Sequence, residues 1–176
     1  MPLYYITGIA GTGKSTIKTE LAHRGYTAYD GDLDGINSWQ NKQTGEQTHR
    51  PPDGAHSKEW LELNDWNMSL LRLKELALEA RNQPVFICGT AGNRHELWYM
   101  FDKVICLTID ETTLKHRLAT RTGNQFGKTE QELTSILGWH KPSEKDDKKA
   151  GAIMVDCTRP LKEVVDEIIE ILDIPS

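Results

Sequence analysis

The sequence predicts an α/β fold of three layers, in which helices cover both faces of a five-stranded parallel sheet. Five short apolar segments, which are typical of buried strands, alternate along the chain with segments of helical periodicity. Such alternation requires crossover connections, and these make the strands parallel. At 176 residues the chain can fill one core but is short for two, so a single domain over residues 1–176 is expected. The predicted strands are Leu3 to Thr7, Tyr26 to Tyr29, Pro84 to Cys88, Lys103 to Ile109 and Ala152 to Val155.

A glycine-rich motif joins the first predicted strand to the first helix. Residues 8–15 match G-x-x-x-x-G-K-[ST], in which backbone N–H groups cradle a polyphosphate, the lysine reaches the β/γ-phosphates and the hydroxyl binds Mg²⁺. The helix that begins at Lys14, and that Gly25 ends, adds its N-terminal dipole to this anion site. The motif predicts that ATP or GTP is bound with magnesium by Gly8, Gly11, Thr12, Gly13, Lys14, Ser15 and Thr16.

Helical periodicity predicts two long amphipathic helices. Apolar residues recur every three or four positions from about Ser57 to Asn82, which predicts one helix that stops before Pro84. A second apolar face runs from Leu161 to Leu172, with acidic residues opposite. Both stripes are interpreted as core faces and not as cofactor sites.

A polar segment from about residue 31 to 56 follows the second predicted strand. An open α/β sheet presents the carboxyl ends of its strands there, so this segment is interpreted as an insertion on the substrate side. Trp39, Trp60 and Trp66 flank it. They are interpreted either as a stacking surface for a substrate ring or as packing of the insertion on the core.

A second polar segment covers residues 122–149 and is expected to form a mobile lid. One short helix is predicted within it. A capping box at Thr129 and Glu132 begins this helix, and Gly138 follows its last turn.

Aspartates that follow the second strand are candidates for metal and acceptor contacts. The third strand ends without an acid, so the carboxylate that many phosphate-loop enzymes place near magnesium is expected from residues 30–34. Asp30 is predicted to approach Mg²⁺ through water. Asp32 is predicted to hold an acceptor hydroxyl or take its proton, with Asp34 beside it. The alternative is a turn whose aspartates bond their own backbone.

Two arginines precede the predicted lid. Arg117 and Arg121 lie four residues apart on a predicted helix and are expected to project from the same side. Guanidinium groups suit phosphate oxygens and neutralise charge during phosphoryl transfer. The alternative is that both are solvated surface side chains.

The loop after the third strand is a candidate for acceptor binding. Gly89 and Gly92 allow a ligand to approach the sheet edge closely, and Asn93 and Arg94 supply polar contacts. The alternative is a plain connection from strand to helix.

Composition limits the remaining classes of function. A net charge of −5 and a pI near 5.7 argue against a broad nucleic-acid surface. No run of 18 apolar residues and no signal-peptide pattern is found, so a soluble, cytoplasmic protein without membrane contact is expected. Cys88, Cys106 and Cys157 lie far apart in or beside apolar runs and are interpreted as buried hydrophobic residues.

Taken together, these residues resemble the small-kinase branch of P-loop proteins, namely the shikimate and gluconate kinases and the adenylate-kinase-like nucleoside monophosphate kinases. An AAA-type ATP-binding assignment is compatible with this resemblance. Residues 29–32 are similar to the shikimate-kinase segment whose paired aspartates serve magnesium and the acceptor. The resemblance implies that Arg117 and Pro160 enclose the adenine and that residues 121–128 belong to a lid. The chain lacks the lid arginine of shikimate kinases, so the resemblance implies a reaction class and no named substrate.

The sequence therefore predicts an ATP- and Mg²⁺-dependent kinase of a small metabolite, with a hydroxyl acceptor preferred. One alternative is a nucleoside monophosphate kinase, in which Arg50 or Arg94 would grip the acceptor phosphate. The other is an ATP-binding switch with slow hydrolysis and a partner-dependent change of state.

Overall fold

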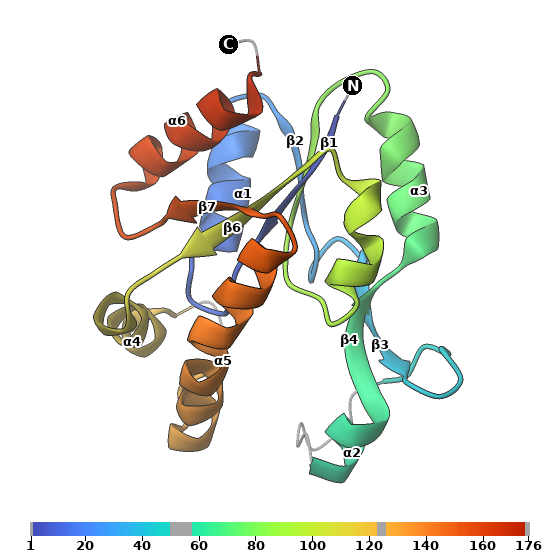
Figure 1. The fold of residues 1–176 in the computed structure, drawn as a ribbon, viewed down its shortest axis with the longest axis vertical. Coiled ribbons are helices and arrows are strands. Elements are labelled where there is room, and N and C mark those ends of the chain that lie inside the picture. The colour runs from blue at the N-terminus through green and yellow to red at the C-terminus, as the bar shows by residue number, and fades with distance from the viewer. Residues whose placement is uncertain (1, 50–57, 123–125, 175–176) are drawn as a thin grey trace.

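The computed structural model describes residues 2–49, 58–122 and 126–174. Its elements follow the predicted alternation of strands and helices (Figure 1). In chain order they are β1 (Leu3–Thr7), α1 (Lys14–His23), β2 (Thr27–Asp30), β3 (Asn37–Asn41), α2 (Lys58–Leu63), β4 (Asn64–Met68), α3 (Leu70–Glu79), β5 (Val85–Cys88), the 3₁₀-helix η1 (Arg94–Met100), β6 (Lys103–Thr108), α4 (Glu111–Thr120), α5 (Glu130–Lys149), β7 (Ile153–Asp156) and α6 (Leu161–Leu172).

Five of the strands form one parallel sheet in the order β2-β5-β1-β6-β7, with β1 at its centre. These are the five strands that the apolar runs predict, and every boundary agrees within one residue. All five end at the same edge of the sheet because they are parallel. The phosphate loop after β1, the aspartates after β2 and the glycine loop after β5 therefore meet at this edge.

Alternate residues of each strand pack into two separate cores, one on each face of the sheet. Tyr4 and Ile6 of β1 face the core that contains α1, α4 and α6. Leu3 and Tyr5 face the core that contains α3 and η1. Figure 1 shows α1 beside α6 on one side and α3 with η1 on the other, which gives the predicted three layers.

The inserted segment is larger than predicted, because the long helix expected from Ser57 to Asn82 does not form. In its place lie α2, the strand β4 and α3. β4 pairs antiparallel with β3, and Trp39 lies opposite Trp66. The asparagine and aspartate side chains of β4 compete with the backbone for hydrogen bonds and so disfavour a helix interior. Ser69 then begins a new helix by accepting from the Arg72 N–H. The β3–β4 hairpin projects from the edge of the domain (Figure 1).

The helix predicted after Thr129 begins as expected but is much longer. The capping box of Thr129 and Glu132 is present, whereas Gly138 does not end the helix, and α5 continues through Pro142 to Lys149. The second half of α5 is fastened to the core, because His140 Nε2 lies 2.8 Å from the Ile109 carbonyl oxygen. The expectation of one short helix is therefore wrong, whereas the mobility of residues 122–149 stays a prediction. Among the described residues, no helix combines the length and apolar character that a membrane crossing requires.

Candidate functional site

The phosphate loop connects β1 to α1 and has the backbone conformation that its glycines permit. Gly13, which caps α1, has a φ of 95° and lies in the left-handed region. Lys14 folds back over the loop and donates to the carbonyl oxygens of Gly8 and Ile9, at 2.6 and 2.9 Å. Burial lowers the pKa of Lys14 to about 8, with Asp32 as the largest opposing charge. Without a ligand, the lysine is thus held by the backbone of the loop itself.

Ser15 and Asp30 meet directly beside the loop. Ser15 Oγ donates to Asp30 Oδ2 at 2.9 Å, while Asp30 Oδ1 accepts from the backbone N–H groups of Asp32 and Leu33. Asp30 therefore stabilises a turn, as the alternative interpretation of the sequence expected, and it also faces the phosphate loop. A hydroxyl and a carboxylate are oxygen donors of the kind that Mg²⁺ prefers. Among the described residues, no group of three or more His, Cys, Asp or Glu side chains is arranged to hold a metal ion.

The other two aspartates of this turn have different roles. Asp34 Oδ2 accepts from the Asp30 backbone N–H at 2.7 Å, so its carboxylate stabilises the turn. Asp32 is exposed, and its Oδ1 accepts from Trp66 Nε1 at 2.9 Å and from Asn37 Nδ2 at 3.1 Å. Sequence reasoning missed Asn37 and treated Trp66 as a packing or stacking residue, because only the pairing of β3 with β4 brings both to Asp32.

Glycines allow the ends of β2 and β5 to approach each other closely. A Cβ atom on Gly31 would lie 2.9 Å from Asn37 Nδ2, and one on Gly89 would lie 3.2 Å from the Gly31 Cα. Thr90 follows and donates from its hydroxyl to the Gly8 carbonyl oxygen at 2.5 Å. The loop after β5 is thereby tied to the phosphate loop.

Asn93 and Arg94, expected as substrate contacts, have partners within the protein. Asn93 accepts from the Met68 N–H at 2.8 Å and donates to the Met68 carbonyl oxygen at 3.0 Å, so both ends of its amide fasten β4. Arg94 Nε donates to Asp147 Oδ1 at 2.8 Å, and the Arg94 side chain is only 14% exposed. These two side chains hold the insertion and α5 against the sheet.

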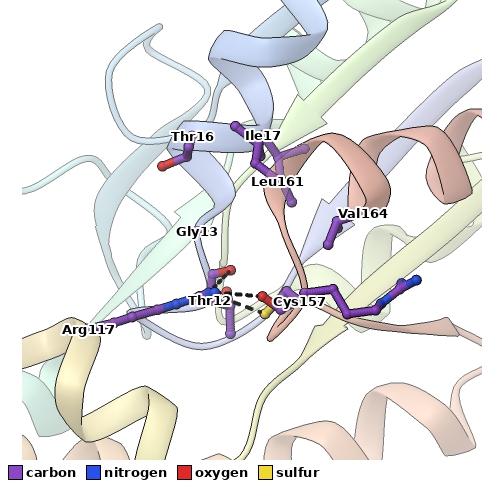
Figure 2. Close-up of a pocket in the computed structure, with 9 residues that line it drawn as sticks. Thr12, Gly13, Thr16, Ile17, Arg117, Cys157, Leu161 and Val164 are labelled. Atoms are coloured by element: carbon purple, nitrogen blue, oxygen red, sulfur yellow. Dashed lines mark hydrogen bonds between the residues drawn. The ribbon is translucent and has the colours of Figure 1, made fainter.

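Arg117 lies between the phosphate loop and the residues that follow β7. It donates to the Thr12 carbonyl oxygen at 3.4 Å and to the Cys157 carbonyl oxygen at 2.7 Å, and so joins the loop to the connection between β7 and α6. Figure 2 shows this bridge at the edge of a pocket of about 250 Å³. The pocket is lined by Thr12, Gly13, Thr16, Ile17, Arg117, Cys157, Arg159, Leu161 and Val164.

The remaining predicted residues are not gathered in the same way. Arg121 is the C-cap of α4 with extended backbone, and it donates to the Phe126 carbonyl oxygen, so the expectation that it shares a helix face with Arg117 is wrong. Pro160 caps α6 next to Arg159 of the pocket lining. Arg50 lies outside the described residues.

Residues 5–138 match the family model described as AAA domain. The chain belongs to this family. It is also 27% identical, over 97% of its length and 93% of the relative, to the thermoresistant gluconokinase of Escherichia coli strain K12.

Two solved structures have the same fold. A gluconokinase from Sinorhizobium meliloti 1021 superposes with a TM-score of 0.59 at 19% identity and covers 98% of this chain and 91% of that one. A shikimate kinase from Acinetobacter baumannii, in complex with shikimate, gives a TM-score of 0.62 at 15% identity and covers 98% and 93%. The predicted P-loop kinase fold is confirmed, and the protein is a P-loop small-molecule kinase.

Proposed function

We propose that the protein transfers the γ-phosphoryl group of ATP to a hydroxyl group of a small polyhydroxy metabolite, with gluconate as the first candidate. The observation that carries this proposal is the contact between the phosphate loop and the turn formed by residues 30–34. The phosphate loop and the aspartate turn meet through the Ser15–Asp30 hydrogen bond, with the exposed Asp32 two residues further on. The full-length similarity to a gluconokinase supports the choice of the first acceptor.

The residues of the chain have separate tasks in this reaction. Lys14 and the loop amides neutralise the phosphates, and Arg117 borders the pocket that would take the base of the nucleotide. Asp32 orients the acceptor hydroxyl and takes its proton as the oxygen attacks the γ-phosphorus and the bond to ADP breaks. Ser15 and Asp30 would hold Mg²⁺, which neutralises charge on the phosphate oxygens when it is bound.

The alternative, a nucleoside monophosphate kinase, needs a cation that is free to hold the acceptor phosphate. Arg94 is already paired with Asp147, whose side chain is 1% exposed. The described part of the site therefore favours a hydroxyl acceptor over a phosphate acceptor.

A screen for ADP release tests the proposal. ATP and Mg²⁺ are supplied with gluconate, other sugar acids, sugars, cyclitols, shikimate, nucleosides and nucleoside monophosphates, and Lys14→Met protein is the negative control. We expect stimulation of at least tenfold by a polyol or sugar acid. Stimulation by a nucleoside monophosphate alone would favour the alternative, and slow hydrolysis that no acceptor changes would favour an ATP-binding switch.

A further inference from the structure

Two donors from the inserted hairpin hold the carboxylate of Asp32 by a single oxygen. Trp66 Nε1 and Asn37 Nδ2 both donate to Oδ1, at 2.9 and 3.1 Å. Oδ2 has no hydrogen-bond partner among the residues that the structure describes. Because both donors act on one oxygen, they fix the plane of the carboxylate and leave the second oxygen for a ligand.

Trp66 is itself held firmly against the sheet edge. Its carbonyl oxygen accepts from the Gly92 N–H at 2.7 Å, and Asn93 bonds both backbone groups of Met68 two residues later. Its ring packs on Trp39 with 5.3 Å between centroids. The indole therefore donates from a fixed position and not from a freely moving loop.

Asn37 connects the same carboxylate to the nucleotide side of the site. Its Nδ2 also donates to the Thr90 carbonyl oxygen at 3.3 Å, and the Thr90 hydroxyl donates to the Gly8 carbonyl oxygen, which accepts from Lys14 as well. The Asn37 backbone N–H donates to the Gly31 carbonyl oxygen at 2.8 Å. Asn37 is buried, so this connection is shielded from water.

We infer that Trp66 and Asn37 are positioning residues that aim the free oxygen of Asp32 at the acceptor hydroxyl. The inference rests on the proposed function of Asp32. The β3–β4 hairpin would then do more than shape the acceptor pocket, because it would also set the orientation of the carboxylate that takes the proton. Small errors in such orientation cost large factors in rate.

Trp66→Phe tests the role of the indole because it keeps an aromatic ring and removes only the donor. We expect kcat with the acceptor to fall about tenfold, with the KM for ATP and acceptor-independent hydrolysis unchanged within about twofold. Trp60→Phe is the matched control, since Trp60 packs on Trp39 in the same aromatic cluster and should leave kcat within about twofold.

A double-mutant cycle separates positioning from a structural role. In an Asp32→Asn background, Trp66→Phe and Asn37→Ala should each change the remaining rate by less than about twofold, because they act through the carboxylate that has been removed. The same tenfold loss in both backgrounds would show that these residues act elsewhere, and would overturn the inference. Melting temperatures of all variants identify any loss that comes from unfolding.

The indole N–H resonance of Trp66 gives a readout that does not need turnover. In a ¹H–¹⁵N spectrum it is assigned by its absence in Trp66→Phe. In Asp32→Ala, which removes the acceptor oxygen, we expect this resonance to shift and its exchange with water to accelerate, while the Trp60 resonance stays in place. No response would overturn the inference. A clear response without phosphorylation of any acceptor would instead count against the proposed function.

Discussion

The buried pair of Arg94 and Asp147 should contribute strongly to stability, and Asp147→Asn tests this. The substitution keeps the shape of the side chain and removes its charge. Asp147 is 1% exposed, and besides Arg94 it lies 2.7 Å from His95 Nε2. Removing one partner of a buried ion pair costs about 3–5 kcal/mol, since the other charge stays buried without compensation.

The lower end of that range is expected here. The Arg94 side chain is 14% exposed and also donates to the Ala91 carbonyl oxygen and to Ser143 Oγ, so water and two acceptors recover part of the loss. A destabilisation of about 3 kcal/mol in a domain of this size corresponds to a melting temperature lowered by roughly 6–12 °C.

Urea unfolding and calorimetry measure this effect, with Glu111→Gln as the matched control. Glu111 pairs with Lys115 on an exposed helix face, with side chains 60% and 49% exposed, so its loss should leave the free energy of unfolding nearly unchanged. If Asp147→Asn were destabilised by less than about 1 kcal/mol, the pair would not be needed for folding. Arg94 would then be available to bind an acceptor phosphate, and the case against a nucleoside monophosphate kinase would be lost.

Three further predictions concern the catalytic residues. Lys14→Met should lower kcat at least about a hundredfold, or roughly 3 kcal/mol, without loss of fold, as measured by ADP release and circular dichroism. Asp30→Asn should lower activity and also lower stability by about 1–2 kcal/mol in urea, because a neutral amide oxygen accepts the two backbone N–H groups more weakly than the carboxylate does. Asp32→Asn should lower activity alone. Burial lowers the pKa of Lys14 to about 8, so much of this lysine is neutral at about pH 9 in the free protein. Bound phosphates favour the protonated form, so binding of ADP without metal should take up close to one proton at about pH 9. The affinity for ADP should therefore weaken as the pH rises above 8. Calorimetry in two buffers of different ionisation enthalpy measures this uptake, and an equal uptake by Lys14→Met would contradict the assignment to Lys14.

Features set by local sequence were predicted well. The phosphate loop needs glycines and a lysine at fixed spacing, and buried parallel strands are short apolar runs, so both can be recognised without the fold. The capping box at Thr129 is equally local. These signals identify the P-loop fold and the start of α5 correctly.

Features that depend on distant partners were not predicted. The apolar periodicity between residues 57 and 82 indicates a helix, but β3 supplies a strand partner that periodicity cannot reveal. Arg94 appears as an available cation until the fold brings Asp147, 53 residues away, to its guanidinium group. Trp66 likewise becomes a donor to Asp32 only across the hairpin.

The hairpin has consequences for how this kinase can change its substrate over evolution. The Ser69 N–H donates to the Ile36 carbonyl oxygen at 2.9 Å, so the chain enters and leaves the hairpin at neighbouring points. The residues that fasten it, Gly92 and Asn93, belong to the loop after β5 and not to the hairpin. Because its ends are closed by the scaffold, the segment between them can be lengthened, shortened or exchanged at small entropic cost. If the proposed function holds, exchanging this segment between related kinases while keeping Asn37 and Trp66 is expected to change the preferred acceptor without changing the affinity for ATP, as a screen of acceptors would measure.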